Sequence, residues 1–154
     1  VEATETTNEQ QKEVLANKVI KEMGDIDGKK IAIWGLSFKP KTDDMRCAPA
    51  INIIEKLLAK GAKITAYDPV AMENAKKIFN SRICFVDEMY DCLDDAEALI
   101  IITEWSQFRE PDFSKIKSKL KFPRIFDGRN IYSPERMKEY GFNYISIGRG
   151  GGVF

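Results

Sequence analysis

The 154-residue sequence contains no histidine, so it lacks the most frequent general base and the most frequent metal ligand of proteins. Its three cysteines, Cys47, Cys84 and Cys92, include no C-x-x-C pair, so neither a zinc site nor a disulfide framework is indicated. We expect free, buried thiols in a reducing cytosol. Without a histidine to activate it, Cys47 is not expected to be a catalytic nucleophile.

An excess of charge of one sign is also lacking, because 24 lysines and arginines balance 24 aspartates and glutamates. Composition therefore gives no indication of a nucleic-acid or membrane partner, and we expect neither. No apolar run approaches the roughly 18 residues of a membrane span, and the polar start VEATETTNEQ does not resemble a signal peptide. Because Val1 stands where an initiator methionine would, we expect a piece of a longer protein. The free thiols lead us to expect a cytoplasmic location.

What the sequence does contain is a regular alternation of short apolar runs with amphipathic segments. The runs are Ile31–Trp34, Ile64–Tyr67, Ile83–Val86, Leu99–Thr103, Arg124–Phe126 and Tyr144–Ile147. Alternation of this kind is typical of a parallel sheet with helices on both faces. We predict a three-layer α/β/α, Rossmann-like domain with a mostly parallel sheet of about six strands, preceded by an N-terminal helix over residues 8–23.

The helices between the runs are predicted from apolar spacing and from residues that begin or end helices. An apolar stripe that starts at Ile51 ends at Gly61, which suits the position after a helix. Ser133 followed by Pro134 is typical of a helix start. Three further helices are predicted over residues 71–79, 87–92 and 113–120.

The loop after the first strand, residues 35–48, is longer than the roughly 2–6 residues usual for such connections, and it is highly charged. It is not a dinucleotide-binding turn, because Gly35 is its only glycine and that motif needs G-x-G-x-x-G. Lys39 and Arg46, close to the next helix, are suitable phosphate ligands. The alternative is a solvated loop with internal ion pairs.

Ligands of such sheets bind beyond the carboxyl ends of the strands, so the residues that follow the strands are the candidates for function. Asp68 is either a ribose-binding carboxylate or a turn residue. Arg129 is either an anion ligand or a turn arginine paired with Asp127. Thr103 is expected to be an N-cap with Glu104 in the first turn of a helix, although Glu104 is also a candidate ligand contact.

Residues 35–50, GLSFKPKTDDMRCAPA, resemble the G-x-x-F-K-x-x-T-D-D-x-R-x-x-P-A motif of the UDP-glucose/GDP-mannose dehydrogenase family. The likeness continues in the family's order, through AYDP, ITEW, FDGRN and IGRG, and NEQQK resembles the end of the helix that leaves its central domain. The chain is therefore similar to the C-terminal, UDP-binding domain of this family, and most like bacterial UDP-glucose 6-dehydrogenases.

This resemblance implies a division of the chain into three parts. Residues 1–27 would end the helix from the central domain, residues 28–150 would form the nucleotide-sugar-binding domain, and residues 151–154 would be a flexible tail. Full-length members oxidise UDP-glucose twice at C6, to UDP-glucuronate, and reduce NAD⁺ that is bound mainly by an N-terminal domain. A central domain makes the homodimer. The catalytic cysteine motif has no match here, so this piece should be inactive alone.

The resemblance also implies roles for individual residues. Lys39 matches a lysine that contacts the UDP-sugar, Arg129 matches an arginine of the substrate site, and Phe38 lines the same loop. Arg46 matches an arginine that reaches NAD. No catalytic residue and no metal ligand is implied. Cys47 departs from the glutamate common in the family, which leaves the role of that glutamate open here.

Two alternative functions remain from the sequence. A sibling dehydrogenase that acts on GDP-mannose or a UDP-N-acetyl sugar would share these motifs, because other domains build most of the sugar pocket. A free-standing flavodoxin-like or receiver-like module is disfavoured, because the first strand ends in Gly35 and not in an acidic pair.

Overall fold

A computed structural model of the chain describes residues 14–37, 41–45 and 48–147, and it contains one sheet of six strands. The strands are β1 (Lys30–Trp34), β2 (Lys63–Tyr67), β3 (Cys84–Phe85), β4 (Ala98–Ile101), β5 (Arg124–Asp127) and β6 (Asn143–Ser146). Their spatial order is β3-β2-β1-β4-β5-β6, and every neighbouring pair is parallel. The predicted Rossmann-like parallel sheet is confirmed.

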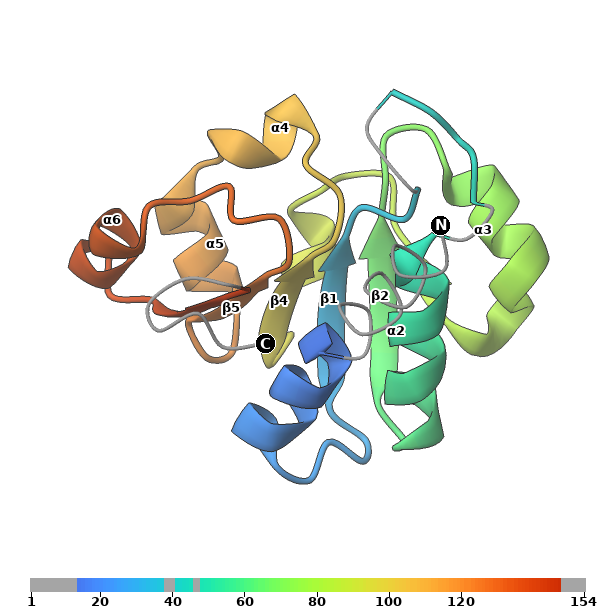
Figure 1. The fold of residues 1–154 in the computed structure, drawn as a ribbon, viewed down its shortest axis with the longest axis horizontal. Helices are drawn as coiled ribbons and strands as arrows, with labels where there is room; N and C mark the ends of the chain where they lie inside the picture. The colour runs from blue at the N-terminus through green and yellow to red at the C-terminus, as the bar shows by residue number, and fades with distance from the viewer. Residues whose placement is uncertain (1–13, 38–40, 46–47, 148–154) are drawn as a thin grey trace, which may run out of the picture.

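Helices cover both faces of the sheet, as Figure 1 shows with α2 on the near side, α3 at the right and α6 at the left. One face is covered by the N-terminal helix (residues 14–23), α2 (Pro49–Ala59) and α3 (Met72–Phe79). The other face is covered by the 3₁₀ turn η2 (Asp91–Leu93), α4 (Ser106–Arg109), α5 (Phe113–Lys119) and α6 (Pro134–Glu139). A second 3₁₀ turn, η1 (Asn80–Arg82), follows α3.

The central strand β1 shows how alternating side chains build the two layers. Ile31 and Ile33 pack into the apolar core on the α2 side, whereas Ala32 and Trp34 pack into the core on the α5 side, and all four are fully buried. The order reverses between β1 and β4, where ligands of doubly wound sheets bind. This order differs from the 2-1-3-4-5 order of flavodoxin-like folds, which removes that alternative.

Most predicted helix boundaries are confirmed within two residues, and their local causes are visible. Pro49 occupies the first turn of α2, and Gly61 follows that helix with a φ of 89°. The Ser133 hydroxyl accepts a hydrogen bond from the Arg136 N–H at the start of α6 (3.4 Å). These ends were predictable because they depend on local backbone chemistry.

The helix predicted over residues 87–92 is wrong for most of its length, because only Asp91–Leu93 forms a 3₁₀ turn. The indole N–H of Trp34 donates to the Met89 carbonyl (2.8 Å), which ties this segment to the central strand β1. The expected N-cap at Thr103 is also wrong, since α4 begins after Trp105 and has no side-chain cap.

The N-terminal helix is part of the main core and contributes Leu15, Ala16, Val19 and Met23 to it. Lys18 Nζ donates to the Ser146 carbonyl at the end of β6 (3.3 Å). Residues 8–13 of the predicted helix and the predicted flexible tail lie outside the described residues. The helix therefore packs on the domain through an apolar face of its own.

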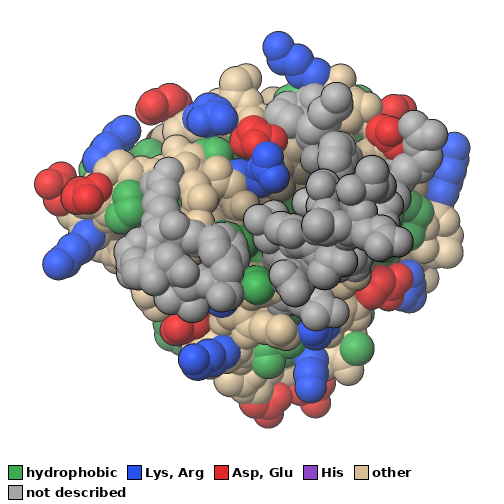
Figure 2. All heavy atoms as spheres, viewed as in Figure 1, with side chains coloured by type: hydrophobic (Ala, Val, Ile, Leu, Met, Phe, Trp, Pro, Cys, Tyr) green, Lys and Arg blue, Asp and Glu red, His purple; other side chains and the backbone are tan. Residues whose placement is uncertain are grey.

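The visible surface mixes charges of both signs (Figure 2), in keeping with the equal numbers of acidic and basic residues. Among the described residues, none of the helices has the length and apolar character required to cross a membrane. Because charges of both signs are mixed over the surface, a binding site for a charged ligand must come from a local group of side chains.

Candidate functional site

The carboxyl ends of β1, β2, β4 and β5 are joined by hydrogen bonds between the segments that follow them. The buried polar residues at these strand ends include Asp68, Thr103 and Asp127, all fully shielded from solvent. A buried polar group needs partners, and each of these side chains has found them in a neighbouring loop or in its own turn. The network shapes the edge of the sheet where a ligand is expected.

Asp68 is a structural residue, which decides between the two roles left open for it. Its carboxylate accepts backbone N–H groups of Leu36 (2.8 Å), Val70 (2.8 Å) and Ala71 (2.8 Å), and the indole N–H of Trp105 (3.3 Å). A carboxylate with so many donors has little capacity left for a ribose. Asp68 therefore clamps the loops after β1, β2 and β4 together.

Asp127 has a similar role in the loop after β5. Its carboxylate accepts the backbone N–H groups of Arg129 (2.9 Å) and Ile131 (2.8 Å) and the hydroxyl of Tyr144 on β6 (2.6 Å). These bonds set the path of the turn that carries Arg129. The guanidinium of Arg129 does not pair with Asp127.

Arg129 pairs instead with Glu104, the residue that sequence reasoning had placed in a helical turn. Nε and Nη2 of Arg129 donate to Oε2 of Glu104, at 2.8 and 2.5 Å. The Arg129 side chain is 43% exposed and that of Glu104 is 21% exposed. The position of Glu104 three residues after β4 was the available signal, because the ends of β4 and β5 lie side by side in the sheet.

The loop after β1 is described only in part. Lys39, Phe38, Arg46 and Cys47 lie outside the described residues, so their predicted roles stay predictions. The described residues of this loop are tied to the domain: Asn74 Nδ2 of α3 donates to the Asp43 carbonyl (2.8 Å).

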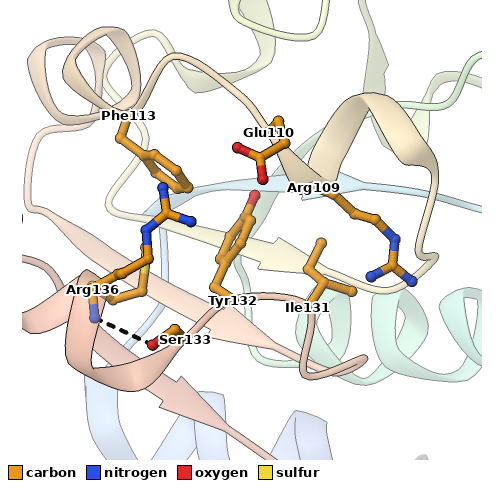
Figure 3. Close-up of a pocket in the computed structure, with 8 residues that line it drawn as sticks. Arg109, Glu110, Phe113, Ile131, Tyr132, Ser133 and Arg136 are labelled. Carbon is orange, nitrogen blue, oxygen red and sulfur yellow. Dashed lines mark hydrogen bonds between the residues drawn. The ribbon is translucent and has the colours of Figure 1, made fainter.

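A separate pocket of about 150 Å³ lies between the segment after α4 and the start of α6 (Figure 3). Its lining includes Arg109, Glu110, Phe113, Tyr132 and Arg136. The Arg136 guanidinium lies over the Phe113 ring, at 5.9 Å from its centroid. Its lining carries two arginines and one glutamate, and Arg129 does not line it.

Two buried groups have shifted acidity for reasons unrelated to catalysis. Burial raises the pKa of the Cys92 thiol to about 12, while its S–H donates to the Thr65 carbonyl (3.0 Å). Burial and the nearby Asp127 carboxylate raise the pKa of the Tyr132 phenol. Cys92 is free and buried as expected, whereas Cys84, also free, is exposed on the short edge strand β3, so the expectation of burial is wrong there.

Comparison with known proteins places this geometry in a family. Residues 32–134 match the UDP binding domain of the UDP-glucose/GDP-mannose dehydrogenase family. UDP-glucose 6-dehydrogenases of Rhizobium meliloti and Pseudomonas aeruginosa are 47% and 42% identical over 97% and 96% of this chain, and over 34% of each of those proteins.

The solved structure of a UDP-glucose dehydrogenase from the archaeon Pyrobaculum islandicum superposes with a TM-score of 0.77 at 26% identity, over 94% of this chain and 31% of that one. The chain thus spans about a third of the length of the curated relatives it matches. Since the family model covers most of the chain and includes the site described above, the chain belongs to the UDP-glucose/GDP-mannose dehydrogenase family, of which it is the UDP binding domain.

Proposed function

We propose that this chain is the UDP-sugar-binding domain of an NAD-dependent UDP-glucose 6-dehydrogenase. The full-length protein would oxidise UDP-glucose to UDP-glucuronate in two steps. The observation that carries this proposal is the match of residues 32–134 to the family's UDP binding domain, supported by the 42–47% identity to bacterial enzymes of that name.

The proposed ligand site lies beyond the carboxyl ends of β1, β4 and β5. There Arg129 presents a half-exposed guanidinium, which is suited to a phosphate oxygen because its N–H groups form a planar fork. Lys39 is proposed to contact the UDP-sugar and Phe38 to pack near the nucleotide. A diphosphate carries negative charge that two cationic side chains would balance locally, although the domain as a whole is neutral.

The edge of this sheet does not itself fit a dinucleotide. Gly35, the first residue after β1, is already packed against Thr103, and the Asp68 carboxylate is occupied by backbone N–H groups. This edge is therefore not suited to bind NAD by itself. NAD would be bound mainly by another domain of the parent enzyme and would supply hydride transfer there, with Arg46 reaching toward it.

The chemistry is proposed to lie outside this chain, because none of its segments resembles the family's cysteine motif. The domain alone would bind and orient the nucleotide part of the substrate without catalysing its oxidation. The parent would be a cytoplasmic homodimer assembled mainly through another domain.

Calorimetric titration of the full-length parent enzyme with UDP-glucose tests the proposal. Lys39→Ala is expected to weaken binding by roughly tenfold or more, because a charge-assisted contact to phosphate is lost. Lys41→Ala is the matched control, since Lys41 is an exposed lysine of the same loop with no proposed contact. Equal affinity of the wild type and the Lys39 variant would contradict the assignment.

A further inference from the structure

The segment just after β4 contains Thr103, Glu104 and Trp105. Each of these side chains forms a hydrogen bond with a different neighbouring segment. The Thr103 hydroxyl donates to the Ser37 carbonyl in the loop after β1 (2.8 Å), and the Trp105 indole donates to Asp68 after β2 (3.3 Å). Glu104, between them, accepts from Arg129 after β5. The residues on both sides of Glu104 are therefore held through their side chains, which limits the movement of the backbone that carries the Glu104 carboxylate.

The backbone that carries Arg129 is held as well. Its N–H donates to Asp127 Oδ1 (2.9 Å), and the N–H of the preceding Gly128 donates to the Ile101 carbonyl (2.9 Å). A half-exposed arginine on a fixed backbone would still sample many rotamers in water. The bonds to Glu104 remove that freedom and hold the side chain in one orientation.

The geometry of the pair leaves one edge of the guanidinium for a ligand. Both bonds from Arg129 end on the same oxygen, Oε2 of Glu104, and they use Nε–H and one N–H of Nη2. A guanidinium has five N–H donors, so three remain, two on Nη1 and one on Nη2. Among the described residues none accepts from these three, so the open edge presents a fork of the shape that phosphate oxygens fit.

We propose that Glu104 is a positioning residue that holds the Arg129 guanidinium with its open edge toward the diphosphate of the nucleotide sugar. This inference rests on the proposed function, which makes Arg129 a substrate contact. Pre-orientation strengthens binding because the arginine loses less conformational entropy when the ligand arrives. Glu104 does not contact substrate in this scheme and acts through Arg129 alone.

A role as a negative charge and a role in positioning predict opposite changes in the affinity for UDP-glucose when Glu104 is removed, which makes the inference testable. If Glu104 acted only as a negative charge near the diphosphate, its removal would tighten binding of UDP-glucose. If it positions Arg129, Glu104→Ala weakens binding by roughly tenfold, or about 1.4 kcal/mol. Glu104→Gln keeps an acceptor oxygen at the same place, so it should recover part of that loss.

The experiment is a double-mutant cycle between Glu104 and Arg129 in the full-length parent enzyme, read by calorimetric titration with UDP-glucose and with UDP. Arg129→Ala should weaken binding, and Glu104→Ala should weaken it in the wild type but add little in the Arg129→Ala background. KM should rise more than kcat falls, because a contact to the diphosphate is shared by the ground and transition states. Glu110→Ala is the control, as Glu110 is an exposed acid that the structure does not pair with Arg129.

The outcomes separate the inference from the function on which it rests. Weaker binding by Arg129→Ala together with unchanged or tighter binding by Glu104→Ala overturns the positioning role and leaves the proposed function intact. Unchanged binding by Arg129→Ala overturns the assignment of Arg129 itself and the inference with it. If Glu104→Ala does not fold, Glu104→Leu decides, because leucine has no acceptor oxygen for Arg129, so tighter or unchanged binding by a folded Leu variant contradicts positioning.

Discussion

Gly35 and Thr103 lie against each other where β1 and β4 end, so closely that a Cβ on Gly35 would come within 2.5 Å of the Thr103 Cβ. Gly35 also has a φ of 97°, which side chains disfavour, and its N–H donates to the Tyr67 carbonyl (2.8 Å). Two independent constraints thus require glycine at this position. The contact brings the loop after β1 next to the segment that carries Glu104.

Gly35→Ala is expected to lower the free energy of unfolding by about 3 kcal/mol, from overpacking against Thr103 and from the unfavourable φ. Gly28→Ala is the matched control, because Gly28 has a similar φ of 76° but open space around it. This variant should lower the free energy of unfolding by only about 1 kcal/mol. Urea unfolding of the chain measures both. Equal losses would show that the contact with Thr103 adds no strain.

Asp68→Asn is expected to lower the free energy of unfolding by about 2–4 kcal/mol, because an amide N–H₂ would face backbone N–H groups that now donate to a carboxylate. Asp87→Asn is the control: Asp87 follows β3 and is exposed, so it should change stability by less than about 0.5 kcal/mol. Urea unfolding measures both variants. An unchanged free energy of unfolding for Asp68→Asn would contradict the proposed role of Asp68 in holding the loops together.

Cys92 is expected to resist alkylation in the folded chain, because only the thiolate reacts and burial raises the pKa of this thiol to about 12. Cys84, which is exposed, should react first under the same conditions. Peptide mapping by mass spectrometry after iodoacetamide treatment measures this, with urea-unfolded protein as the control in which both react. Labelling of Cys92 as fast as Cys84 in the folded protein would contradict its burial.

The Tyr132 phenol should make stability fall at alkaline pH. The pKa of this phenol is raised above the usual value of 10.0 in the folded chain. Its contribution to the free energy of unfolding is therefore complete below about pH 10. The contribution is lost as the pH rises, because the unfolded chain ionises first. Ultraviolet absorbance should therefore show a tyrosine that ionises only as the protein unfolds. Tyr132→Phe should abolish this ionisation step at high pH, called here the late transition. It should also lower the free energy of unfolding by about 1–3 kcal/mol, since the Phe108 carbonyl loses its donor.

A matched variant separates the effect of burial at Tyr132 from a general alkaline transition. Tyr140→Phe removes an exposed tyrosine whose ring lies beside Arg136, and it should leave the late transition in place. If the late transition survives in Tyr132→Phe, it belongs to another group.

Leu15→Ala should lower the free energy of unfolding by about 2–4 kcal/mol, because Leu15 is buried in the main core beside Gly128. Asn17→Ala, on the exposed side of the same helix, is the control and should change stability by less than about 0.5 kcal/mol. Urea unfolding measures both. A small effect of Leu15→Ala would mean that the N-terminal helix is not part of the folding unit.

The fold was largely predictable from local patterns. Six apolar runs predicted six strands, and Pro49 and Ser133 marked helix starts because capping depends on a few neighbouring residues. The helix predicted over residues 87–92 is replaced by a 3₁₀ turn at Asp91–Leu93. In this segment the Met89 carbonyl accepts from Trp34, more than fifty residues away in sequence, a contact that local patterns do not indicate.

The site was predictable in composition but not in pairing. The sequence identified the strand ends and Arg129 as candidates, and it left open whether Asp68 binds a ligand and whether Arg129 pairs with Asp127. Those choices depend on which loops become neighbours when β4 lies between β1 and β5.

By itself, then, the sequence determined the α/β alternation, the lack of histidine chemistry and the likeness to a UDP-binding domain, because these reside in residue types and short spacings. The tertiary structure alone decided that Asp68 and Asp127 are structural and that Glu104 holds Arg129. The physical reason is that a buried or half-buried polar group takes its partners from whichever loops the strand order brings beside it.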